Sequence, residues 1–78
     1  MTEQEYYDLE ALTKTPGWKM VSEFVARQIA GLLSDLERTS FRDLAEVAHI
    51  QGKLQAYRAV LDYPGTRLRE YEKRQKEA

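Results

Sequence analysis

Glu46 and His49 form the pair of side chains whose spacing most clearly suggests chemistry. Four-helix carboxylate proteins hold two iron ions with a Glu-x-x-His motif of this kind on a helix, together with further glutamates on facing helices. A helical hairpin that carries one such motif and one further glutamate could complete the site by dimerising. The positions of the other carboxylates therefore decide whether a metal can bind.

The other glutamates do not complete that site. In an antiparallel hairpin, the counterpart of Glu46 is Glu37, which lies beside the exposed joint, and Glu23 falls roughly two helical turns or more from His49. The chain is superficially similar to encapsulated ferritins, which are hairpins with such a motif, but its glutamates are wrongly placed. We expect no metal site, and a solvated His49 beside Glu46 and Lys53 at helical spacing.

The sequence offers no other catalytic constellation. It has no cysteine, and its single histidine has no Ser-His-Asp context. Four glycines are scattered at positions 17, 31, 52 and 65, so there is no phosphate-binding loop. We expect no catalytic residue, no cofactor and no enzymatic activity.

A few aromatic and basic side chains near two Pro-Gly dipeptides could bind a ligand by stacking and phosphate contacts. These candidates are Tyr6, Tyr7, Trp18, Lys19 and Arg67. A tryptophan in the first turn of a helix also commonly closes one end of a core. Both interpretations of Trp18 stay open at this point.

Charge argues against a nucleic-acid partner and hydropathy against a membrane. The net charge is −1, and Glu70 and Glu72 interrupt the basic C-terminal segment of residues 66–78. The first twelve residues carry four acids and no base. The longest uncharged stretch, residues 28–34, is far too short to span a bilayer, and no signal peptide is visible.

Two long amphipathic patterns predict the fold. Apolar residues recur every three or four positions from Trp18 to Leu36 and again from Leu44 to Leu61, as helical faces require. We expect helices over 16–38 and 41–62, joined by a tight connection in which Ser40, or alternatively Thr39, caps the second helix. A short connection makes such helices antiparallel.

Facing positions of this hairpin pair apolar residues along its whole length, for example Ile29 with Leu54 and Leu36 with Val47. Gly31 and Gly52 fall at one level, where the helices either approach closely or tolerate two surface glycines. Proline at positions 16 and 64 predicts breaks, and so two short flanking helices over 1–14 and 64–77. The prediction is a single all-α domain, 1–78: an antiparallel two-helix hairpin with a short helix at each end.

The apolar surface is wider than one hairpin seam can cover, and a chain of 78 residues is marginal alone. We therefore expect a homo-oligomeric helical bundle, with a two-fold dimer as the default. Its interface is predicted to contain Phe24, Leu33, Phe41, Gln51 and Gln55.

Three segments, 16–18, 51–56 and 61–64, resemble small uncharacterised phage and prophage proteins whose genes often lie among those for heads and packaging. The shared features, over residues 16–68, are a Trp near the start of one helix, a Gln-Gly-Lys segment in the next and a Pro-terminated end. The resemblance implies a non-enzymatic role in virion structure or assembly, in the host cytoplasm or the virion, with itself, another phage protein or a host protein as partner. The alternatives are an oligomeric anti-defence protein that sequesters a nucleotide second messenger, and a ferritin-like di-iron hairpin.

Overall fold

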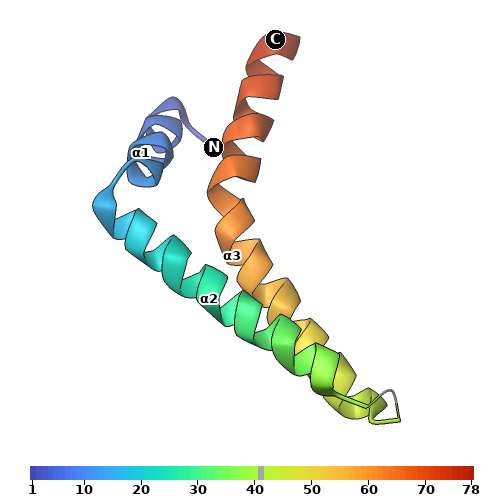
Figure 1. Ribbon diagram of the computed structural model, residues 1–78. Coiled ribbons are helices and arrows are strands. Elements are labelled where there is room, and N and C mark those ends of the chain that lie inside the picture. Colours follow the sequence, from blue (N-terminus) through green and yellow to red (C-terminus); the bar gives the residue numbers. More distant parts are fainter. Residues whose placement is uncertain (41) are drawn as a thin grey trace.

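A computed structural model describes residues 1–40 and 42–78, and these residues form three α-helices and no strand. They are α1 (Glu3–Thr13), α2 (Pro16–Arg38) and α3 (Leu44–Glu77) (Figure 1). The predicted all-α class is confirmed. Among the described residues, no helix combines the length and the hydropathy needed to cross a membrane.

The first two helices begin directly after threonine caps. The Thr2 hydroxyl accepts a hydrogen bond from the Glu5 N–H at 3.1 Å, and the Glu5 carboxylate accepts one from the Thr2 N–H at 3.0 Å, which completes a capping box. The Thr15 hydroxyl accepts from the Trp18 N–H at 3.1 Å, with Pro16 at the first helical position. These caps fix the point at which Trp18 enters the fold.

The start of α3 differs from the prediction. Asp43, and not Ser40 or Thr39, is its N-cap, because the Asp43 carboxylate accepts from the Glu46 N–H at 3.1 Å. A negatively charged carboxylate also interacts favourably with the positive end of the helix dipole, whereas a hydroxyl carries no net charge. Thr39 instead ends α2, and the Ser40 hydroxyl accepts from the Arg42 N–H at 3.2 Å in the connection. The predicted start at position 41 lies outside the described residues.

The predicted break at Pro64 is wrong, since α3 runs through it as one helix of 34 residues. Proline in a helix interior removes one backbone hydrogen bond and costs about 3 kcal/mol. Here the Pro64 ring is buried beside Leu9 and Leu12 of α1 and Trp18 of α2, which offsets that cost. Gly65 does not have the positive φ that ends many helices.

The core lies between α2 and the first half of α3. Val25, Ile50 and Leu54 are buried, at 5%, 3% and 4% exposure, and they belong to the two apolar faces that the spacing predicts. The half-buried members of these faces include Ile29, Leu32, Leu36, Val47, Tyr57 and Leu61. Figure 1 shows α2 and α3 close together near their connection and diverging away from it, with α1 at the open end.

Gly31 and Gly52 do not mark a close approach within the chain. A Cβ atom built on either glycine would meet nothing within 4 Å, and both residues are exposed. The surface interpretation of the two glycines is therefore correct for the isolated chain.

The molecule is elongated. It extends 51 × 30 × 13 Å, with a radius of gyration of 16.6 Å, whereas a compact domain of this length has a radius of about 12 Å. It exposes 6120 Å² of surface, compared with about 4,900 Å² for a compact monomer of its mass. The fold thus leaves an unusually large surface uncovered.

Leu54→Ala should lower the free energy of unfolding by about 2–5 kcal/mol, because it opens a cavity between α2 and α3. Leu44→Ala is the matched control: Leu44 is 72% exposed, and its loss should change stability by less than about 0.5 kcal/mol. Urea unfolding followed by circular dichroism measures both. Equal effects of the two substitutions would show that the core is wrongly placed.

Candidate functional site

An apolar cleft opens where the three helices diverge. It has a volume of about 390 Å³, and the described residues that line it include no charged side chain. The lining residues are Leu9 and Leu12 of α1, Trp18 of α2, and Ala59, Val60, Tyr63 and Pro64 of α3. A cleft of this size and character can take one or two large apolar groups.

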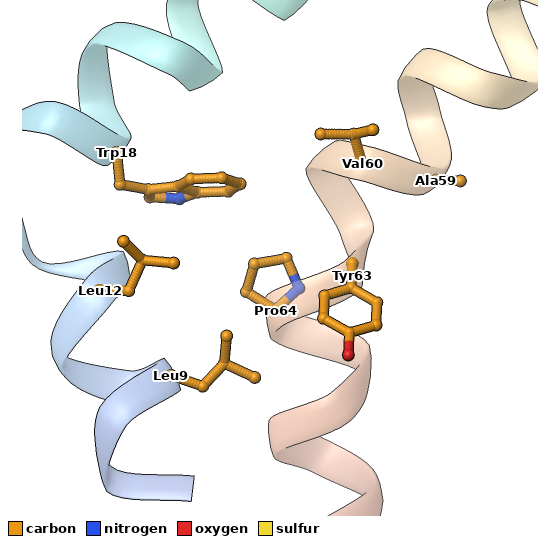
Figure 2. Close-up of a pocket in the computed structure, with 7 residues that line it drawn as sticks. All are labelled: Leu9, Leu12, Trp18, Ala59, Val60, Tyr63 and Pro64. Atoms are coloured by element: carbon orange, nitrogen blue, oxygen red, sulfur yellow. The ribbon is translucent and has the colours of Figure 1, made fainter. Parts of the chain in front are cut away.

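The cleft is built from both sides. Figure 2 shows Trp18 and Leu12 pointing from α2 and α1 toward Pro64 and Val60 of α3. Trp18 is half-buried, so it closes the core at the open end of the molecule and also forms one wall of the cleft. Its position follows from the Thr15 cap, and that of Pro64 from the unbroken helix α3.

Helix α1 is fastened to the C-terminal half of α3 by Tyr6. The Tyr6 ring stacks on that of Tyr71, with ring centroids 4.6 Å apart, and the Tyr6 hydroxyl donates to the Glu72 carboxylate at 2.7 Å. This hydrogen bond to Glu72 is the main cause that raises the pKa of Tyr6 to about 12. Because α1 has no buried residue, these contacts hold it against α3, where it forms one side of the cleft.

The rim of the cleft beside α1 is acidic. Glu5 and Asp8 line an adjoining hollow of about 300 Å³ together with Met1, Leu9, Leu12 and Tyr63. The backbone hydrogen bond from Thr2 is the largest of the causes that lower the pKa of Glu5. Glu5 is therefore charged at neutral pH.

The five residues predicted to contact a ligand are placed apart. Trp18 lines the apolar cleft, whereas Lys19 lines a different hollow with Lys14 and Pro16. The Tyr6 hydroxyl is hydrogen-bonded to Glu72. The Tyr7 ring packs edge-on against the Tyr6 ring, with ring centroids 5.6 Å apart, and Tyr7 is 54% exposed. Arg67 forms an ion pair with Glu70 at 3.1 Å. Nothing in this arrangement favours a nucleotide over any other ligand.

The predicted interface residues are exposed where the structure describes them. Phe24 is 50% and Leu33 39% exposed, and Gln51 and Gln55 are also exposed. Phe41 lies outside the described residues. Phe24 and Leu33 are nine residues apart on α2, which is about two and a half helical turns, so they point to opposite sides of that helix.

Within residues 1–40 and 42–78, no three His, Cys, Asp or Glu side chains are grouped as metal ligands would be. His49 is exposed, and the Glu46 N–H is engaged with the Asp43 cap.

Of these places, the apolar cleft is the candidate site that the geometry supports best.

Sequence reasoning missed the cleft because it expected α3 to end before Pro64. The signal was present: Tyr57, Leu61, Pro64, Leu68 and Tyr71 step by four and three residues, which is one continuous helical face. No protein-family model, curated protein or solved structure matches this chain. The site must therefore be interpreted from its own geometry.

Tyr6→Phe should remove the last tyrosine to ionise. Because the pKa of Tyr6 in the folded chain is raised from 10.0 to about 12, its contact with Glu72 stabilises α1 fully below pH 10 and is lost as the pH approaches 12. An absorbance titration of phenolate should show a late-ionising phase in the native chain that is lost in the variant. Identical titration curves would rule out the Tyr6–Glu72 contact in solution.

His49→Ala should leave both metal content and melting temperature unchanged, since His49 is an exposed residue on a charged face. Elemental analysis of the purified protein and a thermal melt measure the two properties. Stoichiometric iron or zinc that disappears in the variant would revive the di-iron hypothesis.

Proposed function

We propose that this chain is a non-enzymatic protein that acts by self-association, with an antiparallel hairpin of α2 and α3 as the unit that pairs. The observation that carries this proposal is the excess surface: 6120 Å² exposed by a chain of 9.1 kDa, about 1,200 Å² more than a compact monomer of that mass. A chain that small gains much of its stability by covering such surface with another subunit.

The character of the exposed surface supports the same proposal. The described residues include nine large apolar side chains that are at least 39% exposed. They are Tyr7, Leu12, Met20, Val21, Phe24, Leu33, Leu44, Val60 and Tyr63. Grouped apolar surface beyond a few hundred Å² is uncommon on soluble monomers and marks interaction sites.

The exposed apolar residues are unevenly distributed. Seven of these nine lie at the open end, on α1, the first half of α2 or residues 60–63 of α3. Leu33 and Leu44 lie nearer the connection. The open end is therefore the stronger candidate for self-association, and the Leu33 side is left for a different contact.

The resemblance of residues 16–68 to small phage proteins suggests the setting for this activity. A protein that assembles with itself through one face and keeps a second face free suits a component of virion structure or assembly in an infected cell. The second face would then meet another phage protein or a host protein. The resemblance, and not the geometry, carries this part of the proposal.

Self-association predicts a mass above 9.1 kDa by light scattering at micromolar concentration. Because dimerisation and folding are linked, the melting temperature should rise with protein concentration. A chain that stays monomeric, with a melting temperature independent of dilution, would contradict the proposed function.

A further inference from the structure

We propose that the apolar cleft receives the side chains Met20, Val21 and Phe24 of a second copy of the chain, in a reciprocal two-fold contact. These three exposed residues of α2 form the α2 stripe. The inference rests on the proposed function and makes it specific, because it names the surface and its occupant.

The cleft requires an apolar occupant. Its walls are formed by Leu9, Leu12, Trp18, Ala59, Val60, Tyr63 and Pro64, and none of these side chains is charged. A charged or strongly hydrated group would lose its water there without gaining a partner. An aromatic or thioether side chain would instead replace water over the Trp18 ring and the Pro64 ring.

The chain itself presents such side chains. Met20 is 71%, Val21 47% and Phe24 50% exposed. At positions i, i+1 and i+4 they lie on one flank of α2, and Val21 is one turn from Trp18, which lines the cleft. The α2 stripe therefore adjoins the cleft on the same molecule but does not line it.

Adjacency of the two surfaces fits a two-fold axis. In an isologous contact the same patch serves both copies, so the α2 stripe of one copy can enter the cleft of the other while its own cleft is filled in return. Both halves of the contact are satisfied at once and the assembly closes at two copies.

The area available matches a stable homodimer. If each copy covers its excess of about 1,200 Å², the pair buries roughly 2,400 Å². Obligate homodimer interfaces bury upwards of about 2,000 Å² in total. A small apolar ligand in the same cleft would leave most of that surface, including the α2 stripe, exposed.

The edges of both surfaces carry charged side chains. Glu5 and Asp8 stand beside the cleft. Arg27 follows Phe24 by three residues and Glu23 follows Met20 by three, so a base and an acid both border the α2 stripe, and charge does not select the orientation of the pair.

Trp18 is the single tryptophan and serves as a reporter of the cleft. In a dilution series its emission should shift to longer wavelength as dimers dissociate, because water then reaches the indole. Phe24→Glu should remove the concentration dependence and leave the emission at the long-wavelength limit. Met20→Glu should do the same, and because Met20 is 71% exposed it tests the contact without disturbing the monomer.

Leu33→Glu is the matched control, since Leu33 is also exposed but lies on the opposite side of α2. It should keep both the dimer mass and the emission shift. Circular dichroism checks that each variant stays helical, and Met20→Glu decides the question if Phe24→Glu does not fold.

The failures of the two proposals can be told apart. The cleft contact is overturned if light scattering shows a dimer but the Trp18 emission does not change on dilution. It is also overturned if the dimer persists in Met20→Glu and dissociates in Leu33→Glu. Either result leaves self-association intact. A chain that is monomeric at every concentration overturns both.

Discussion

The burial of Pro64 inside an unbroken helix is the interaction on which the open end of this molecule depends. With 34 residues, α3 is about 51 Å long, whereas the 23 residues of α2 reach about 35 Å. The last part of α3 therefore has no α2 beside it. Leu9 and Leu12 of α1 cover this part at Pro64, and Tyr6 fastens α1 further along at Tyr71 and Glu72. The cleft is the gap that this arrangement leaves between α1, Trp18 and Val60.

The parts of the fold that local chemistry decides could be predicted from sequence. Capping by Thr2 and Thr15 involves residues a few positions apart, and the helical spacing of Val25, Ile50 and Leu54 indicates burial directly. The break at Pro64 was predicted wrongly, because the rule that proline ends a helix considers only the lost hydrogen bond and the clash of the ring with the preceding turn. The burial that compensates comes from α1, and its docking cannot be deduced from residues 62–65 alone.

The candidate site shows the same division. Trp18 was singled out from sequence for its place at the start of a helix, and the structure places it both at the end of the core and in the wall of the cleft. The sequence did not single out Val60, Leu9 and Leu12 as cleft residues, because they become neighbours only when α3 continues past Pro64 and α1 docks on it. Phe24 and Leu33 are both exposed and lie on opposite sides of α2, so the predicted interface that contains both stays a prediction.

Among the described residues the buried aliphatic side chains are Val25, Ile50 and Leu54, which is little core with which to offset the entropy of ordering the backbone. Covering the open end with a second copy supplies the missing burial without lengthening the chain. Small-angle X-ray scattering across a concentration series tests this account most directly. It predicts a forward-scattering mass of two chains at high concentration, falling on dilution to one chain with a radius of gyration near 16.6 Å. A mass of one chain at every concentration, with a compact radius near 12 Å, would contradict both the elongated fold and the pairing that follows from it.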